Sequence, residues 1–584
     1  MSEPRIPPDG LAGRVFPRVF GRALPVVERG EGITLHASDG RSYLDAAGGA
    51  IVVNVGHGRR SVADVMAAQA SRVAYAHGTA FTSAALEAYA EELGSILPLD
   101  APAVYPVSGG SEAIETALKM ARAYHLARGE TDRQIVIARW GSYHGNSLGA
   151  LDLSGRQPLR RPYEAWLGRF RHVSAAYPYR GGEPRSNALG DVAELAGELE
   201  RVILSAGPGT VAAFVAEPIV GATLGAVVPP EGYWPAIVDV CRRHGVLVVA
   251  DEVMTGFGRT GRWFGGDHWG GRPDLLAAAK GATSGYWPFG FVAAAGPIYE
   301  TIAAGGFVHG FTFSHSITGA AVAREVLRIL REEDLVAASA AKGRLLADLL
   351  TERLADHPHV GEVRGRGLMV GLEIVADRAT RAPFPRAERR TEALVAAARE
   401  RGILIYSGTG NANGVDGDLI LLGPPFVVTD DELVRIADGV AGAVEAATPG
   451  VAAGFGRPPR RRSAAGWAGR REESVDSERQ RHGCDRAVRE MHDPAVRGLT
   501  GSAGRDSRGL AGTRRSSAPF GAPWIGRDRA PGARSRCLRP ERGPAACWIV
   551  RLPYTSRASA AGTGRASRVP GPGTAECPRL SGGA

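Results

Sequence analysis

Lysine is rare in this chain, and Lys280 is the lysine found where chemistry is expected. The chain has 584 residues and 70 Lys plus Arg, of which three are lysines. Lys119 and Lys342 lie in helical patterns, whereas Lys280 follows a short apolar run and precedes a Gly/Ser-rich turn. A desolvated ε-amine can lose its proton and attack a carbonyl to form a Schiff base, which a guanidinium cannot do. The sequence therefore predicts an enzyme that forms an imine.

Such an enzyme needs an anchor for a cofactor phosphate, and the run Ser108, Gly109, Gly110 and Ser111 is a candidate. The run lies between a short strand pattern and the start of a helical pattern. Bare glycine backbone allows close approach, and the N–H groups of a helix N-terminus attract a phosphate. A simple capping turn with Ser111 as the cap is the alternative, because glycine loops often precede helices.

Two further side chains follow predicted strands. Asp251 ends the run GVLVVADEV, at the carboxyl end of a buried strand, where ligands bind in open α/β sheets. It could pair with a protonated ring nitrogen of a cofactor, or simply with backbone or an arginine. Tyr143 begins a turn after another strand, and its ring could stack on a planar cofactor. We interpret the adjacent His144 as a structural, hydrogen-bonded histidine and assign it no acid–base role.

The elements that must position these residues read as an α/β fold. From about residue 100 to 300, apolar runs of strand length alternate with helical segments, which is typical of a parallel sheet covered by helices on both faces. The strand runs are RQIVIARW, TVAAFVAEP, GVLVVADEV and FGFVAAAG. Beyond about residue 316, one long helical region, the strand RGRGLMVGLEIVAD, a further helix and the strand LILLGPPFVV predict a smaller α/β domain. Near the N-terminus, ITLHASDGRSYLDAAGG predicts a hairpin.

We therefore predict four regions. Residues 1–50 pack on the small domain, residues 51–315 form the large domain and residues 316–450 form the small domain. Residues 451–584 hold 26 Arg, no Lys and 11 Asp plus Glu, a charge of +15 that leaves −6 for the rest. Their Gly/Arg/Pro/Ala composition predicts disorder. It also suggests a frameshift or read-through extension, with an arginine-rich nucleic-acid-binding tail as the less favoured alternative.

Composition narrows the class of protein further. Cys241 is the single cysteine among residues 1–450, and the tail cysteines form no C-x-x-C pair, so neither a metal site nor a disulfide framework is indicated. No apolar run of ~18 residues occurs, and the first residues lack the apolar core of a signal peptide. We expect a soluble, cytoplasmic protein with no membrane partner.

Taken together, the motifs resemble the class III aminotransferases, which include the ω-amino acid transaminases. The similarity covers about residues 10–447 and rests on NVGHG, SGGSEAIETALKMAR, YHG, AEP, DEVMTGFGRTG, DLLAAAKGATSGYWPFG, HGFTFSH and GPPFVVT. The resemblance implies pyridoxal phosphate as the cofactor. It also implies fold type I, a three-layer sandwich with a mainly parallel sheet, next to a smaller α/β domain.

The resemblance also implies roles for individual residues. Lys280 would hold pyridoxal phosphate as a Schiff base, and Asp251 would pair with its ring nitrogen. Thr312 is similar to the threonine that reaches the phosphate of the neighbouring subunit, which implies a homodimer with shared active sites. The other implied cofactor contacts are Gly110 and Ser111 at the phosphate, Tyr143 over the ring, and Glu217 near the ring oxygen.

One departure from the family pattern concerns the substrate. The family often has an arginine before GPPF that binds a substrate carboxylate, whereas residues 419–422 here read Leu-Ile-Leu-Leu. How the donor binds therefore cannot be carried over, and Phe81, Trp287 and Phe289 are only plausible pocket residues by position.

The implied reaction is a ping-pong transfer of an amino group from an amine or amino acid donor to a 2-oxo acid. An aminomutase or a decarboxylating transaminase on the same fold is the alternative. A nucleic-acid-binding module is disfavoured, because residues 1–450 are acidic and contain no basic motif interleaved with aromatic residues.

Overall fold

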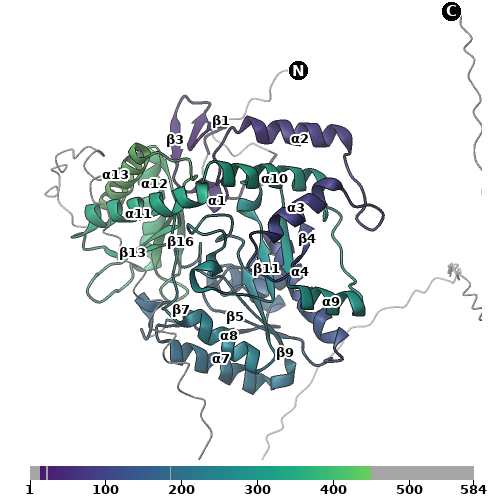
Figure 1. Ribbon diagram of the computed structural model, residues 1–584. Coiled ribbons are helices and arrows are strands. Elements are labelled where there is room, and N and C mark those ends of the chain that lie inside the picture. The colour runs from purple at the N-terminus through teal and green to yellow at the C-terminus, as the bar shows by residue number, and fades with distance from the viewer. Residues whose placement is uncertain (1–13, 21–23, 184–185, 449–584) are drawn as a thin grey trace, which may run out of the picture. The chain divides into compact units, whose positions relative to one another are not determined.

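A seven-stranded sheet forms the centre of the described chain (Figure 1). The computed structural model describes residues 14–20, 24–183 and 186–448, which belong to one unit of the chain, Met1–Glu473. The predicted disordered tail, residues 451–584, lies outside the described residues. In sheet order the strands are β4 (Ala103–Val107), β12 (Gly290–Ala294), β11 (Leu275–Ala278), β10 (Leu247–Asp251), β9 (Val211–Ala216), β5 (Ile135–Arg139) and β6 (Arg171–Val173).

The four apolar runs predicted as strands in this region are all strands. They form β5, β9, β10 and β12. Strands β6, β5, β9, β10 and β11 are parallel, but β12 runs antiparallel to both of its neighbours. The reason is the connection between β11 and β12, which contains the short 3₁₀ helix Lys280–Ala282 and no crossover helix.

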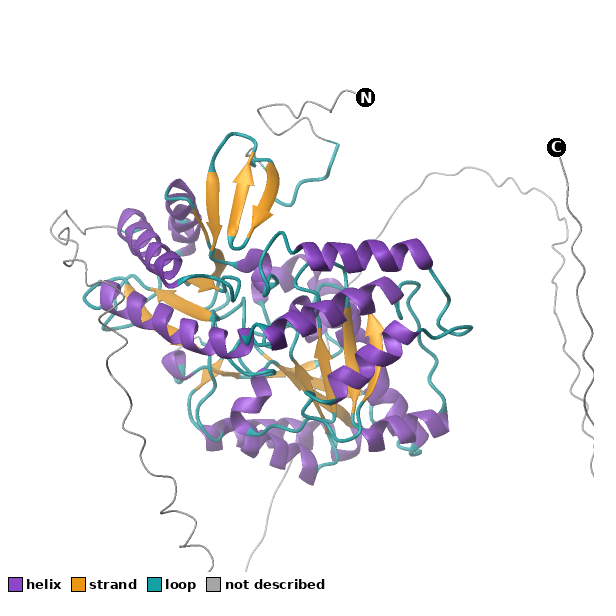
Figure 2. Ribbon diagram, turned by 45° about the horizontal axis from the view of Figure 1, so that its top comes forward, coloured by secondary structure: helices purple, strands orange, loops and turns teal. Residues whose placement is uncertain are grey.

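Helices cover both faces of this sheet, as Figure 2 shows. Alternate residues of β9 point to opposite sides, so Ala213 and Val215 pack in one core cluster and Phe214 and Ala216 in another. The first cluster includes α4 (Gly110–Ala127), α5 (Leu148–Leu153) and α9 (Gly296–Gly305), and the second includes α7 (Val192–Ala206) and α8 (Tyr233–Arg243). This arrangement confirms the predicted three-layer α/β fold with a mainly parallel sheet.

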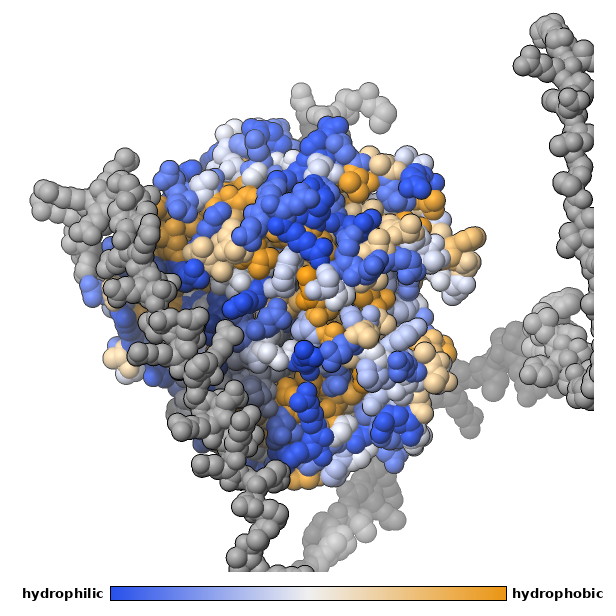
Figure 3. Space-filling view, viewed as in Figure 1, coloured by the Kyte–Doolittle hydropathy of each residue, from blue (hydrophilic) through white to orange (hydrophobic). Residues whose placement is uncertain are grey.

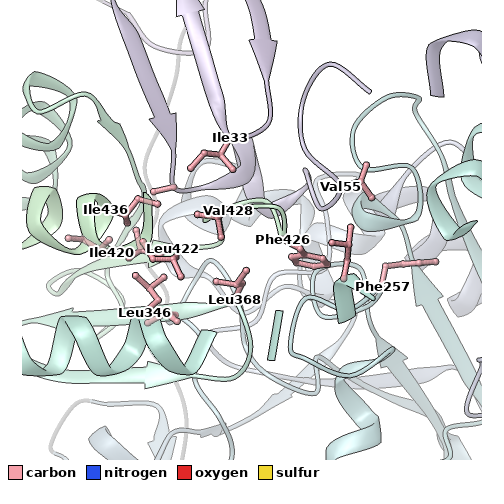
Figure 4. Close-up of a cluster of buried hydrophobic side chains, with 14 of the residues drawn as sticks. Ile33, Val55, Phe257, Leu346, Leu368, Ile420, Leu422, Phe426, Val428 and Ile436 are labelled. Carbon is pink, nitrogen blue, oxygen red and sulfur yellow. The ribbon is translucent and has the colours of Figure 1, made fainter. Parts of the chain in front are cut away.

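A second sheet is antiparallel and has four strands. Its order is β13 (Val360–Gly365), β14 (Val370–Ile374), β17 (Asp418–Leu422) and β16 (Tyr406–Thr409). It packs with α11 (Leu335–Leu354), α12 (Arg390–Glu400) and α13 (Asp430–Ala447) in a core cluster that also contains α3 (Ala84–Gly94) and α10 (Ile317–Glu332). Figure 4 shows Ile33, Leu346, Leu422 and Ile436 gathered in this cluster, although they come from distant parts of the chain.

The N-terminal strands form a third sheet. The predicted hairpin is confirmed, because β2 (Thr34–Ala37) and β3 (Ser42–Asp45) pair antiparallel, with β1 (Val27–Glu31) on the outer side of β2. Strand β3 also pairs in parallel with β15 (Ile403–Leu404), which lies between α12 and β16 in the sequence. The sheet therefore joins the N-terminal segment to the region that follows residue 400.

Two elements differ from the prediction. RGRGLMVGLEIVAD contains β14 and the last two residues of β13, which pairs with it as a hairpin, because the chain turns between the two strands at Gly367, where φ is +55°. The long helical region is two helices, α10 and α11, separated at Asp334, where φ is +47°. Both turns use the left-handed backbone region, which ends a strand or a helix.

Short elements complete the described chain. The remaining helices are α1 (Gly48–Ile51), α2 (Arg60–Arg72) and α6 (Gln157–Arg160), and the strands β7 (Ala175–Ala176) and β8 (Ala188–Leu189) form a small sheet. Further 3₁₀ helices span Arg161–Trp166, Pro178–Arg180, Pro208–Thr210, Gly265–Trp269 and Arg386–Glu388. Among the helices of the described ranges, none is both long enough and apolar enough to cross a membrane.

Candidate active site

A cavity of about 390 Å³ lies at the carboxyl edge of the central sheet. The loops that follow β4, β5, β9, β10 and β11 all contribute to its wall. Carboxyl ends of neighbouring strands meet at one edge of a sheet, and ligands of α/β proteins bind there. Six of the predicted site residues line this one cavity: Gly110, Ser111, Tyr143, Glu217, Asp251 and Lys280.

Lys280 begins the connection between β11 and β12. Its backbone has φ +40°, so the chain turns sharply immediately after the buried strand. The side chain is half-buried, and burial is the largest cause that lowers the pKa of its amine, to about 8. The nearby charges of Asp251 and Glu217 raise this pKa, and the charge of Arg259 lowers it further. Above pH about 8 the amine is mainly neutral, which is the form that attacks a carbonyl.

Asp251 is buried at the end of β10 and both of its oxygens are engaged. Its Oδ2 accepts a hydrogen bond from Nδ1 of His144 at 2.7 Å, and its Oδ1 accepts one from the backbone N–H of Val253 at 3.0 Å. His144 is itself held by Ser154, whose Oγ accepts the His144 backbone N–H at 2.8 Å. The carboxylate therefore has a fixed orientation in the wall of the cavity.

His144 is a positioning residue for Asp251, a role that the sequence did not identify beyond the interpretation of a structural, hydrogen-bonded histidine, which its hydrogen bonds confirm. Its position directly after Tyr143, at the end of a strand in the same sheet as Asp251, was the available indication. Its Nε2 is buried and has no hydrogen-bond partner among the described residues. Because Nδ1 faces a carboxylate, we assign the proton to Nδ1.

The corner between β4 and α4 has the shape and the donors for a phosphate. Helix α4 begins at Gly110, so its free N–H groups face the cavity. The Oγ of Ser108 is buried without a hydrogen-bond partner in the described chain. A Cβ added at Gly109 would meet no protein atom within 4 Å, whereas one at Gly110 would lie 2.8 Å from Cγ1 of Val253. Gly109 therefore borders open space, and Gly110 permits close packing behind it.

Tyr143 and Glu217 are linked across the cavity wall. The backbone N–H of Tyr143 donates to Oε1 of Glu217 at 3.1 Å. The Oε2 of Glu217 makes no hydrogen bond within the described ranges and lies 3.5 Å from a guanidinium nitrogen of Arg139. Burial raises the pKa of the Tyr143 hydroxyl, which therefore stays protonated at neutral pH.

Arg259 is a second residue that the sequence did not identify, although it lies in the motif FGRTG. It is fully buried beside the cavity and donates to Asn54 Oδ1 at 2.6 Å and to the carbonyl oxygens of Leu368 at 2.9 Å and Pro424 at 2.8 Å. These bonds join the N-terminal segment to the region after residue 360. An added Cβ at Gly281, next to Lys280, would lie 2.5 Å from the amide nitrogen of Asn54, so this network packs directly against the lysine loop.

The structure separates the remaining candidates. Trp287 and Phe289 line the cavity, and Phe81 is 69% exposed and lies elsewhere in the single chain. Thr312 is exposed and does not line the cavity of its own chain. The geometry of one chain therefore gathers every predicted cofactor contact except Thr312.

Comparisons with known proteins agree with this arrangement. Residues 17–444 match the family Aminotransferase class-III. The chain is 38% identical over 428 residues to the uncharacterized aminotransferase YodT of Bacillus subtilis, covering 72% of this chain and 96% of the relative. It is 36% identical over 419 residues to a putrescine–pyruvate aminotransferase of Pseudomonas aeruginosa, covering 70% of this chain and 89% of that protein.

Solved structures give the same result. An (S)-enantioselective ω-transaminase from Thermomicrobium roseum is 40% identical and has a TM-score of 0.68, covering 73% of this chain and 93% of the solved one. The ω-transaminase of Pseudomonas jessenii in complex with PMP is 32% identical and has a TM-score of 0.69, covering 74% and 96%. The chain therefore belongs to the class III aminotransferases, enzymes that transfer an amino group between an amine or amino acid and a 2-oxo acid.

Proposed function

We propose that this aminotransferase binds pyridoxal phosphate in the cavity at the carboxyl edge of the central sheet and uses Lys280 as its catalytic residue. The observation that carries this proposal is the meeting of three groups in one cavity. The cavity wall contains Lys280, whose amine has a lowered pKa, and Asp251, whose carboxylate is held in a fixed orientation. It also contains the corner at the start of α4, where the Oγ of Ser108 has no hydrogen-bond partner in the described chain. Class III aminotransferases use this cofactor, and the chain supplies the donor types that it requires.

Each part of the cofactor has a matching group. Gly110 and Ser111, at the start of α4, would hold the phosphate through backbone N–H groups and a hydroxyl. Asp251 would hold the ring nitrogen in its protonated form. Tyr143 would cover one face of the ring, and Glu217 would lie on the side of the ring oxygen. When bound, the cofactor supplies an aldehyde that condenses with amines and a ring that withdraws electrons.

The chain then has three tasks in the reaction. Lys280 would hold the cofactor and, once released, its neutral Nζ would take a proton from the substrate carbon that bears the amino group. Asp251, oriented by His144, would accept a hydrogen bond from the protonated ring nitrogen. Trp287 and Phe289 add apolar surface that excludes water from the reacting atoms.

A half-reaction assay tests the proposed function. Purified protein loaded with pyridoxal phosphate receives one donor at a time, and the panel includes diamines and ω-amino acids because relatives are named for putrescine and taurine. A productive donor should remove the absorbance at about 400 nm of the lysine-bound cofactor, and pyruvate or 2-oxoglutarate should restore it. Protein that takes up no cofactor, and releases no carbonyl product from any donor, would contradict the proposal.

Gly109 offers a test of the phosphate corner. In Gly109→Val, the added side chain should fit the protein but fill the space where the phosphate would bind, because a Cβ there meets no atom within 4 Å. The backbone at Gly109 is extended, with φ 173°, so no strain is expected. We expect the affinity for pyridoxal phosphate to fall by at least about tenfold, the effect of losing a charge-assisted hydrogen bond.

The measurement is a fluorescence titration of apoprotein with pyridoxal phosphate. The melting temperature of the apoprotein should stay unchanged. Gly209→Val is the matched control, because a Cβ at Gly209 also meets no atom within 4 Å and this residue lies outside the cavity, in the 3₁₀ helix Pro208–Thr210. Equal cofactor affinity in Gly109→Val and the wild type would place the phosphate elsewhere.

We also propose a homodimer in which Thr312 completes the partner's cofactor site. Thr312 lies outside the cavity of its own chain. Val308 and Phe313, which are close to it in the sequence, are both at least 68% exposed. Phe81 is a third large apolar side chain that is mainly exposed. On the face shown in Figure 3, hydrophobic residues reach the surface among hydrophilic ones. Association would remove such surface from water.

We therefore expect the wild type to sediment as a dimer and Thr312→Val to bind pyridoxal phosphate at least about tenfold more weakly, because one hydrogen bond to a charged group is lost. Thr301→Val is the matched control, since its hydroxyl only donates to the carbonyl oxygen of Pro297 within α9. A monomeric wild type with full activity would rule out shared sites.

A further inference from the structure

Binding of a 2-oxo acid requires a positively charged side chain to pair with its carboxylate, and no Lys or Arg among the residues that line the cavity is available for this. A 2-oxo acid carries a carboxylate, which must be paired when it leaves water. Among the residues that line the cavity, Lys280 is the one Lys or Arg, and it is committed to the cofactor. Glu217 and Asp251 on the same wall would repel a carboxylate. Residues 419–422 of β17 are all apolar, so that strand supplies no charge either.

The arginines near the cavity wall differ in the hydrogen bonds and ion pairs that their side chains already make. Arg139 donates to the carbonyl oxygen of Glu217 and lies in an ion pair with its carboxylate. Arg259 donates to Asn54 and to backbone carbonyl oxygens on three segments. Arg156 has no such partner. Its Nε is buried without a hydrogen bond, and it forms no ion pair with any carboxylate of the described residues.

The backbone places Arg156 next to Tyr143. The N–H of Gly155 donates to the carbonyl oxygen of Ser142 at 3.1 Å, and the N–H of Gly141 donates to the carbonyl oxygen of Gly155 at 3.1 Å. These two bonds hold the residues before Tyr143 and Arg156 side by side. The guanidinium charge is close enough to the Tyr143 hydroxyl to favour its ionised form, which opposes the effect of burial on its pKa.

Tyr406 of β16 also lies near this arginine. Its hydroxyl and that of Tyr143 are the two groups that raise the pKa of Arg156, whereas burial, the larger cause, lowers it. Strand β16 runs along the cavity wall, because an added Cβ at Gly408 would lie 3.0 Å from the carbonyl oxygen of Ala222, a wall residue. Arg156 is therefore near two tyrosines, one of which, Tyr143, lines the cavity.

We propose that Arg156 recognises the carboxylate of the substrate in this aminotransferase, and the proposal rests on the function proposed above. Arg156 lines a small cavity of about 50 Å³ next to the main one, and its long, unpaired side chain can turn past Tyr143 toward an entering carboxylate. A guanidinium binds a carboxylate through two parallel hydrogen bonds. No existing ion pair has to break, so the same cavity still admits an amine without a carboxylate.

The test compares two carbonyl acceptors of similar size in the half-reaction from the pyridoxamine form. Pyruvate has the carboxylate and propanal lacks it. In Arg156→Gln we expect kcat/KM for pyruvate to fall by at least about tenfold, the effect of losing hydrogen bonds to a charged group, and kcat/KM for propanal to stay within about twofold. The loss should lie mainly in KM. Arg161→Gln, which changes an exposed arginine on the same segment, should match the wild type with both acceptors.

A second measurement does not depend on turnover. Propionate, an unreactive carboxylate, is titrated by calorimetry into the cofactor-loaded protein, and Arg156→Gln should bind it at least about tenfold more weakly than the wild type. Arg156→Lys keeps the charge without the two-point geometry and should recover only part of the affinity. The melting temperatures of both variants show whether the fold is intact.

Two results would overturn the inference. One is an equal loss for pyruvate and propanal in Arg156→Gln, which would indicate a general structural role. The other is unchanged kcat/KM and unchanged propionate binding in that variant. Failure of the proposed function is distinguishable, because the wild type itself would then show no half-reaction with an amine donor that lacks a carboxylate.

Discussion

Lys280→Arg should lose amino transfer by at least about 1,000-fold, because it removes both the covalent attachment and the base that moves the proton. Arginine keeps the positive charge and much of the volume of lysine. Its guanidinium stays protonated and cannot form an imine. The absorbance at about 400 nm of lysine-bound cofactor should disappear with the activity. Steady-state kinetics and an absorbance spectrum of the loaded protein provide the two readouts.

Lys119→Arg is the matched control for this variant. Lys119 is exposed on α4, so the same exchange there removes an amine without touching the cavity.

The rate at which wild-type apoprotein takes up pyridoxal phosphate should rise with pH through about 8, where the amine of Lys280 loses its proton, and then level off. A Lys280→Arg protein with the wild-type spectrum and rate would remove this residue from the mechanism.

Asp251→Asn should lower kcat by roughly 100- to 1,000-fold, the usual effect of removing one preorganised electrostatic group from an active site. The neutral amide cannot keep the ring nitrogen of the cofactor protonated. Lys280 remains, so the cofactor should still be attached and the absorbance near 400 nm should persist in some form. The combination of retained cofactor and lost turnover separates this variant from Lys280→Arg.

The control for Asp251→Asn is Asp274→Asn. Asp274 is also a partly buried carboxylate at the sheet, but it accepts the backbone N–H of Val248 at 2.7 Å and lies outside the cavity. The amide oxygen of the asparagine can accept the same backbone N–H, so kcat should stay close to the wild-type value. If Asp251→Asn kept wild-type kcat, the ring nitrogen would have to bind elsewhere.

The strands of the central sheet could be predicted from the sequence because they are buried on both faces. Continuous apolar runs such as those of β9 and β10, which are rich in Val and Ala, are typical of strands that helices cover on both sides. The direction of β12 could not be predicted, since it depends on how the connection after Lys280 turns. The turns at Gly367 and Asp334 were missed for a similar reason: a single residue with positive φ changes the chain direction within an otherwise continuous pattern.

Some residues of the candidate site could likewise be predicted from the sequence, and others could not. Lys280 and Asp251 were found because their types and strand-end positions are unusual. Arg156 and Arg259 were not assigned roles, and His144 was assigned only a structural one, because what distinguishes these residues is a partner, or the lack of one, far away in the sequence. Pairing across more than a hundred residues is a property of the packed fold and leaves no local pattern.

Some of the predictions lie beyond these observations. The boundaries near residues 50, 315 and 450 stay predictions, as does the origin of residues 451–584. The relatives named above by activity are aminotransferases, and this does not favour the aminomutase or the decarboxylating alternative.

In the proposed function a single amine, that of Lys280, attaches the cofactor. Protein loaded with pyridoxal phosphate is reduced with borohydride, which makes a carbon–nitrogen double bond permanent, and then digested for peptide mass spectrometry. We expect a phosphopyridoxyl group on the peptide that contains Lys280 and none on the peptides of Lys119 or Lys342. A label on either of the other lysines, or on none of the three, would contradict it.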